Sequence, residues 1–388
     1  MFTIKANLLY TGKMLKTDAY ISVDKTIISD IGTEGSKVLK EYPVITPAFI
    51  DPHCHIGLMR FGEPSTEAEG NEKCDSILIF ADILDSIQMD DHAFQKAIQA
   101  GVLYSCVLPG SNNILSGRAA IIRNYGETTT SALIARAGIK AALGFNTIVC
   151  DEWKGKRPTT RMGALAILRE KLFTMVEKLK STTTSTLTKE EEIYENILMG
   201  KEKLRVHAHK ADDIESILRL VDEIHSIHKK YTIKLSIEHA GNIHTPYIFT
   251  MLKKRNIPVV YGPLDAFPYK VELKHMNWKN ISHLLDSKVD FGLMTDHPVV
   301  LQTSFLYQLR LFTRLGLNKE QAIRIITYQN AKILGIDTIL GTLEKRKWAS
   351  FICWNGDPFD MTKYPVAVYG EGKLLYSEKQ AETGNCDN

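Results

Sequence analysis

Several features that would assign a chain to a specialised class are missing from this sequence. Its 388 residues hold only 6 cysteines, scattered and without a C-x-x-C pair, so a disulfide framework is not expected. No segment approaches the roughly 18 consecutive apolar residues of a membrane-spanning helix. The opening residues, MFTIKANLLYTGKML, lack the apolar core of a signal peptide. We therefore expect a cytoplasmic protein with free thiols.

An excess of charge of one sign is also missing. Lys and Arg number 48 and Asp and Glu 45, a formal net charge of +3, so we expect neither nucleic acid nor a membrane surface as a partner. The G-x-G-x-x-G pattern that cradles phosphates does not occur between a predicted strand and a helix. The expected partners are a small-molecule substrate and, in a homo-oligomer, a second copy of the chain.

What the sequence does contain is enough apolar surface for a large core, at 44% of residues. Both ends of the chain have the alternation of short strands, with Gly and Asp at the turns. Near the C-terminus, GEG lies between two strand-like runs, as in a hairpin. Residues 1–46 and 336–388 are therefore predicted to form one composite β-sandwich domain.

Residues 47–335 alternate short apolar runs with longer helical patterns. This alternation is typical of β-α units, so the predicted fold class is α/β, a (β/α)8 TIM-type barrel that forms the catalytic domain. Seven strands are recognisable, at 45–55, 102–110, 139–145, 204–209, 233–239, 257–262 and 289–296. An eighth, expected before residue 204, is not identified. The polar run KSTTTSTLTKEEE is predicted to be a surface loop.

Histidines recur at the ends of the predicted strands. PHCHIG places His53 and His55 two residues apart, and on a strand such residues face the same side. RVHAHK, SIEHAG and GLMTDHP end three later strands, and they supply His207, His209, His239 and Asp296. Because the carboxyl ends of barrel strands form the active face, we expect these side chains to converge.

Imidazoles and one carboxylate suit a metal site for hydrolysis. Zn²⁺ bound in this way keeps a position open for water and lowers the pKa of that water towards about 7. Asp296 could accept the proton and deliver it to the leaving group. A single H-x-H is equally well a polar pair at a strand end, and a single histidine is more often a core residue. The repetition at successive strand ends favours the metal site.

The order HCH, HAH, EH and TDHP, between strand-rich ends, resembles the amidohydrolase superfamily. ITPAFIDPHCHIGL, VLPGSNNILSGRAAII, VHAHKADD and NGDPFD are most similar to the imidazolonepropionase-related amidohydrolases. The resemblance covers nearly the whole chain. It implies a (β/α)8 barrel with a small β-sandwich from both termini, one or two divalent metals, usually zinc, and hydrolysis at an amide-type carbon.

The resemblance also assigns the strands and the ligands. It implies that His53 and His55 lie on the first barrel strand, His207 on the fifth, His239 on the sixth and Asp296 on the eighth. It favours His207 over its neighbour as the ligand from the fifth strand, a choice that strand geometry leaves open.

The neighbour on that strand, His209, is then expected to contact either a metal ligand or the substrate. Arg161, Lys210 and Tyr261 are further candidates, because basic side chains would suit a substrate that carries a carboxylate. Each of them is equally well a residue of the barrel rim. Lys210 also stands where imidazolonepropionases carry an acid, which argues against that activity itself.

A second departure concerns the number of metals. Related sequences tend to have GEN where this chain has GFN, so Phe145 replaces an acid that could bridge two metals. The carboxylated or acidic bridge of binuclear members has no certain counterpart, although Asp151 and Glu152 are close in sequence. Two cations without a bridging anion repel strongly. We therefore predict one tightly bound metal, with His239 polarising the substrate carbonyl; His239 would join a second metal only if an anionic group, such as Asp151 or Glu152, bridged the two.

The sequence thus predicts a metal-dependent hydrolase that acts on a C–N bond, in an amide or cyclic amide, through a metal-bound hydroxide. Zn²⁺ is the expected metal, with Fe²⁺ or Mn²⁺ as alternatives, and Asp296 and His239 are the expected catalytic residues. The alternatives are a deaminase of a nitrogen heterocycle and a catalytically silent binding module with the same fold.

Overall fold

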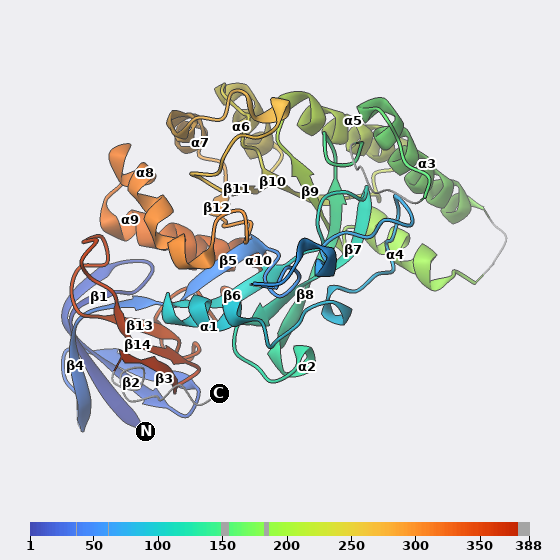
Figure 1. Cartoon of the computed structure of the whole chain (residues 1–388). Helices are drawn as coiled ribbons and strands as arrows, with labels where there is room; N and C mark the ends of the chain where they lie inside the picture. The colour runs from blue at the N-terminus through green and yellow to red at the C-terminus, as the bar shows by residue number, and fades with distance from the viewer. Residues whose placement is uncertain (36, 61, 149–154, 182–185, 379–388) are drawn as a thin grey trace.

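The computed structural model describes residues 1–35, 37–60, 62–148, 155–181 and 186–378, and it contains two β-sheets with helices around the larger one (Figure 1). The smaller sheet gathers the two ends of the chain, and the larger one forms the barrel. No helix in these ranges is both long and apolar enough to cross a membrane.

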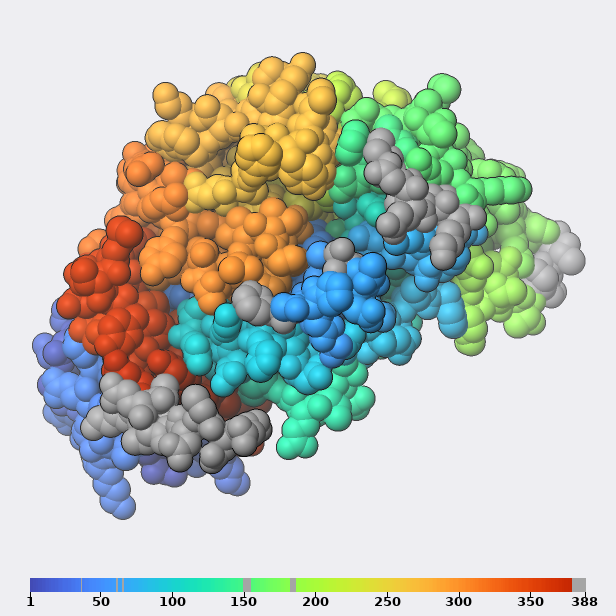
Figure 2. Space-filling model, in the orientation of Figure 1, coloured from blue at the N-terminus to red at the C-terminus, as the bar shows by residue number. Residues whose placement is uncertain are grey.

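The smaller sheet has seven strands in the order β15-β14-β13-β4-β1-β2-β3. Their bounds are β1 (Phe2–Tyr10), β2 (Leu15–Asp24), β3 (Ile27–Gly32), β4 (Val38–Pro47), β13 (Phe351–Trp354), β14 (Pro365–Gly370) and β15 (Lys373–Ser377). The ends of the chain meet where β13 pairs antiparallel with β4, with Cys353 opposite Ile45. In the space-filling view, the red C-terminal segment lies against the blue N-terminal one (Figure 2). The expected union of both termini is therefore present as one sheet, while the sandwich and its boundaries stay predictions.

The larger sheet has eight strands, in sequence order around a nearly closed barrel. They are β5 (Phe49–Cys54), β6 (Val102–Val107), β7 (Leu115–Arg123), β8 (Leu133–Ala142), β9 (Lys203–Ala208), β10 (Lys234–His239), β11 (Val259–Tyr261) and β12 (Phe291–Leu293). Two backbone hydrogen bonds join the first strand to the segment after the last: Asp296 N–H donates to His53 O, and His55 N–H to His297 O. The barrel therefore brings the ends of β5 and β12 together.

The eighth strand, which the sequence did not reveal, is β7. It runs antiparallel to both β6 and β8, so the sheet is not entirely parallel. Antiparallel neighbours need no crossover helix, and only the four-residue α2 (Thr129–Ala132) lies between β7 and β8. The alternation of strands and long helices on which the prediction relied is therefore interrupted here.

Helices cover the outside of the barrel. Besides α2, the α-helices are α1 (His92–Gln99), α3 (Arg161–Lys180), α4 (Lys189–Leu198), α5 (Ala211–Ile227), α6 (Pro246–Lys254), α7 (Ile281–Ser287), α8 (Arg310–Arg314), α9 (Lys319–Arg324) and α10 (Asn330–Leu334). The 3-10 turns are η1 (Ser65–Glu67), η2 (Ile83–Asp85), η3 (Val271–Leu273), η4 (Trp278–Asn280), η5 (Gln302–Ser304) and η6 (Leu306–Leu309), and the π-helical η7 (Ile325–Gln329) joins α9 to α10. Apolar faces of these helices pack on the sheet, as Leu168 and Leu172 of α3 do, both 1% exposed.

The polar run predicted as a loop is in part helical. Helix α4 begins within it, at Lys189, because Thr188 and Glu191 form a capping box: the Thr188 side chain accepts from Glu191 N–H, and the Glu191 side chain accepts from Thr188 N–H. Ile193 and Ile197 then bury an apolar stripe against the core. Local capping and packing outweighed the polar composition.

Candidate metal centre

The carboxyl ends of four barrel strands bring the predicted ligands together. His53 Nε2 lies 3.6 Å and His55 Nε2 3.2 Å from Asp296 Oδ1. His239 Nδ1 lies 4.0 Å from the other carboxylate oxygen, Oδ2. The rings of His53 and His239 are 5.0 Å apart between their centres. Strands β5, β10 and β12 therefore contribute to one cluster, as expected from their order around the barrel.

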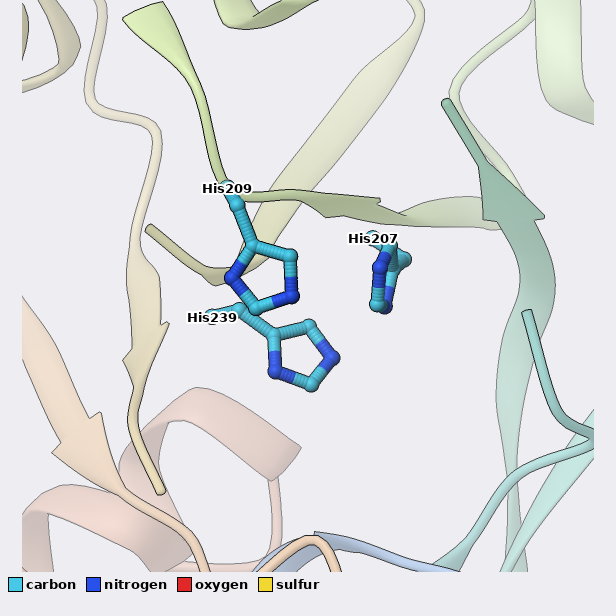
Figure 3. Close-up of side chains that lie close together, drawn as sticks. All are labelled: His207, His209 and His239. Carbon is cyan, nitrogen blue, oxygen red and sulfur yellow. The ribbon is translucent and has the colours of Figure 1, made fainter. Parts of the chain in front are cut away.

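A second group adjoins the first. Figure 3 shows His207, His209 and His239 with their rings close together, the first two from the end of β9 and the third from the end of β10. The ring centres of His207 and His239 are 4.2 Å apart, and those of His207 and His209 are 4.8 Å apart. Two groups of residues have ligand atoms that all lie within 4.8 Å of one another inside the group. One group is His207, His209 and His239, and the other is His53, His239 and Asp296. His239 belongs to both groups, and His209 lies among the ligand-type residues rather than outside them.

Hydrogen bonds fix the tautomer of three imidazoles. The Nδ1–H of His53 donates to Glu238 Oε2 at 2.8 Å, that of His55 to Leu108 O at 2.7 Å, and that of His239 to Gly262 O at 3.1 Å. A carbonyl or carboxylate oxygen can only accept, so the hydrogen is on Nδ1 and the lone pair on Nε2. Oriented imidazoles of this kind are typical of metal ligands.

Burial keeps four imidazoles neutral, those of His53, His207, His209 and His239. It is the main cause that places the pKa of His53, His207 and His239 well below the usual value, and neighbouring positive charges add to it. Burial, followed by the charges of Lys270 and Lys140, lowers the pKa of His209 to about 3. A neutral imidazole has a lone pair on one ring nitrogen, which a cation can bind near neutral pH.

The donor atoms fit a cation because the protein leaves them unpaired. Within the described ranges, both ring nitrogens of His207, His209 Nδ1, His239 Nε2 and Asp296 Oδ1 are buried without a hydrogen-bond partner. A buried polar atom without a partner costs about 1–3 kcal/mol. Several of them facing one another are therefore explained most simply by a shared ligand that accepts lone pairs, which is a divalent metal.

The backbone is strained where two of these side chains leave their strands. His239 has φ +78° and Asp296 has φ +53°, a left-handed conformation that residues with a Cβ adopt rarely. On a regular strand Glu238 and His239 would face opposite sides. Here Glu238 contacts His53 Nδ1 while the His239 ring packs against the His53 ring. The strain thus places two consecutive side chains in the same site.

Lys140, which no sequence motif marked as a site residue, lies on β8 beside the ligands. Its side chain is fully buried, and Nζ lies 3.1 Å from His53 Nε2. Burial lowers the pKa of Lys140 to about 8. The available signal was a lone lysine in the apolar run IKAAL. Phe145, by contrast, lies after β8, where its N–H donates to Glu272 Oε2 at 2.9 Å, and Asp151 and Glu152 lie outside the described residues.

A cavity of about 390 Å³ opens above the cluster. His55, His207, His209 and Asp296 line it, so the predicted substrate contact His209 does reach it. The other three predicted substrate residues do not line it.

Ion pairs and burial hold these three residues elsewhere. Arg161 pairs with Asp213 at 3.2 Å and Glu272 at 3.3 Å, Lys210 pairs with Asp212 at 2.8 Å, and Tyr261 is buried on β11. Their assignment as substrate contacts is therefore not supported. The basic residue that lines the cavity is Lys270, which the sequence analysis did not single out.

Comparison with known proteins gives one family match and several similar structures. The sequence model of the amidohydrolase family matches residues 169–377. Amidohydrolase tasK of Hapsidospora irregularis is 24% identical over 363 residues, which is 86% of this chain but 36% of that protein. The chain thus spans about a third of the length of this curated relative.

Among solved structures, an amidohydrolase from Thermotoga maritima MSB8 superposes with a TM-score of 0.88 at 29% identity, over 97% of this chain and 100% of that one. A Xaa-Pro dipeptidase with bound methionine (TM-score 0.59, 15% identity, 97% and 99% covered) and guanine deaminase of E. coli (0.53, 12%, 97% and 100%) share the fold alone. Since the matched family region spans more than half of the 388 residues, this chain belongs to the amidohydrolase family.

Proposed function

We propose that this chain is a metal-dependent hydrolase that cleaves a C–N bond in an amide or cyclic amide. The observation that carries the proposal is the set of buried, unpaired donor atoms on His207, His239 and Asp296, joined by the oriented Nε2 atoms of His53 and His55. A catalytic site needs such a donor set beneath an open cavity, and the cavity of about 390 Å³ supplies it.

When bound, a divalent ion such as Zn²⁺ activates water and polarises a carbonyl. His53, His55, His207 and Asp296 would hold it. Asp296 would also accept the proton of the attacking water, since its Oδ1 has no hydrogen bond, and deliver it to the leaving nitrogen. His239 would contact the substrate rather than hold the metal; because its Nδ1–H is donated to Gly262 O, its Nε2 would accept a hydrogen bond rather than donate one to the carbonyl.

In this proposal the number of metals depends on the chemical state of Lys140. As a buried amine it offers no bridging anion, and one metal is the proposal. An uncharged lysine amine can instead add to CO₂, forming a carbamate and releasing a proton, and the carbamate oxygens could bridge two metals. The pKa of about 8 leaves part of this amine uncharged near neutral pH. A stoichiometry near two that falls to one when CO₂ and bicarbonate are removed would replace the one-metal proposal.

The test combines metal analysis with a substrate screen. Protein purified without chelator should contain a transition metal, and it should release an amine or acid from N-acyl compounds, dipeptides or cyclic amides. The chelated protein should lose this activity and regain it with Zn²⁺, Mn²⁺ or Fe²⁺. Ammonia release from a heterocycle would identify a deaminase instead. Absence of both metal and activity after metal addition would indicate the catalytically silent binding module.

A further inference from the structure

The cavity above the cluster of candidate ligands is lined by many apolar side chains and few charged ones. Much of the lining is apolar, and several of these side chains remain at the surface: Phe267 is 80%, Tyr269 65%, Val299 48% and Met59 41% exposed. They come from loops after β5, β11 and β12. Exposed apolar side chains that gather around one cavity mark a binding surface for apolar groups.

One cation lies within this apolar lining. In the part of the chain that the structure describes, Lys270 is the only lysine or arginine that lines the cavity, and Asp296 is the only acid. Lys270 is 8% exposed, so its charge is largely removed from solvent. A cation in such a place is costly unless an anion or several acceptors meet it.

The protein itself does not meet this charge with a hydrogen bond. The nearest carboxylate oxygen, Glu272 Oε1, lies 3.9 Å from Lys270 Nζ, which is too far for a hydrogen bond. The other oxygen of Glu272 is taken by Phe145 N–H at 2.9 Å and Arg161 at 3.3 Å. The described residues give the Lys270 ammonium no side-chain or backbone hydrogen bond; its other neighbour is the Tyr269 ring, 4.9 Å away. Its three donors remain for a ligand.

We infer that the substrate is a small amide with two further features, a carboxylate bound by Lys270 and an apolar side chain held by Phe267 and Tyr269. N-acylated apolar amino acids and their cyclic amides have this combination. The inference rests on the proposed function, because it places the scissile amide at His207 and Asp296, which line the same cavity. Lys270 is then a specificity residue, and it does not take part in the bond cleavage.

The test measures binding without turnover, so that it stands apart from the proposed function. The probes are N-methanesulfonyl-L-leucine, in which a sulfonamide replaces the scissile amide, and its methyl ketone, which keeps the shape and lacks the charge. Calorimetry on the metal-loaded protein should show the acid binding about 10- to 100-fold more tightly than the ketone, as expected for a charge-assisted hydrogen bond.

Variants locate the two recognition elements. Lys270→Met should bring the acid-to-ketone ratio close to one, and Lys270→Arg should retain part of it. Lys210→Met is the matched control, because Lys210 pairs with Asp212 outside this cavity, and it should leave the ratio unchanged.

The apolar element is tested with a smaller probe. Phe267→Ser should reduce the preference for the leucine compound over N-methanesulfonylglycine. Tyr247→Ser, at an aromatic residue of α6 that is 60% exposed and does not line the cavity, should not change it.

The outcomes separate the two proposals. Equal binding of acid and ketone to the unaltered protein, or no binding of either, would overturn the inference even if the protein hydrolyses another amide. A preference for the acid that persists in Lys270→Met would also overturn it. A preference that depends on Lys270 in a protein without amidase activity would support the binding site and refute the proposed function alone.

Discussion

Replacing Glu238 by Gln should weaken metal binding although Glu238 is not among the proposed ligands. The carboxylate is fully buried on β10, and its Oε2 accepts from His53 Nδ1 at 2.8 Å and from Arg205 at 3.1 Å. This contact holds the His53 tautomer with the lone pair on Nε2. Glutamine is neutral and presents an N–H₂ group to one side, so the contact to His53 loses its charge or is reversed.

The size of the effect follows from this geometry. A hydrogen bond to a charged group contributes about 1.5–3 kcal/mol, and a tenfold change in affinity corresponds to about 1.4 kcal/mol. The Gln variant should therefore bind metal roughly 10- to 100-fold more weakly, the range seen when partners of metal-binding histidines are removed.

Competition against a chelator of known affinity, with elemental analysis of the protein fraction, measures this change. Ser236→Ala is the matched control, since Ser236 donates to the other oxygen, Oε1, at 2.5 Å and leaves the His53 contact in place. Its loss of metal affinity should be smaller than that of the Gln variant, because the charge of Glu238 and its contact to His53 Nδ1 both remain. A folded Glu238→Gln protein with unchanged metal affinity would refute the argument, as would equal losses in both variants.

Three further results are expected. His207→Ala should lose the metal, whereas His239→Ala should keep it and lose turnover, and elemental analysis with an activity assay distinguishes the two; loss of metal in both would contradict the assigned roles. The free energy of unfolding of the metal-free protein, measured in urea, should rise by about 3 kcal/mol as the pH rises from about 8 to 10.5. The reason is that the pKa of Lys140 is about 8 in the folded protein and 10.5 ordinarily, so the fold carries a costly buried ammonium at low pH and an uncharged amine at high pH. Lys140→Met should lack this gain, and a gain that persists in this variant would disprove the assignment. Removal of residues 340–388 deletes β13, β14 and β15 and exposes the edge of β4, so the remainder should be insoluble or melt without cooperativity; an unchanged melting temperature would show that these strands are dispensable.

The sequence alone determined which strand ends carry the candidate ligands. The period of two placed His53 and His55 on one side of a strand, and the recurrence of histidine and Asp296 after later apolar runs pointed to one face of a barrel. These are local patterns, and they hold as long as each run forms a strand. The joining of both termini in one sheet was also predictable, because short strands at either end of the chain need partners.

Tertiary structure alone decided which charged residues meet the site. Lys140 and Lys270 reach the site, whereas Arg161 and Lys210 do not. A charged side chain pairs with the partners that the fold brings near it. Arg161 pairs with two buried carboxylates, while no carboxylate lies within hydrogen-bonding distance of Lys270. The antiparallel direction of β7 was likewise decided by tertiary structure, because the direction of a strand depends on the segments that connect it to its neighbours and on its pairing with both of them. Such outcomes arise from contacts between residues far apart in the chain, and neither composition nor periodicity encodes them.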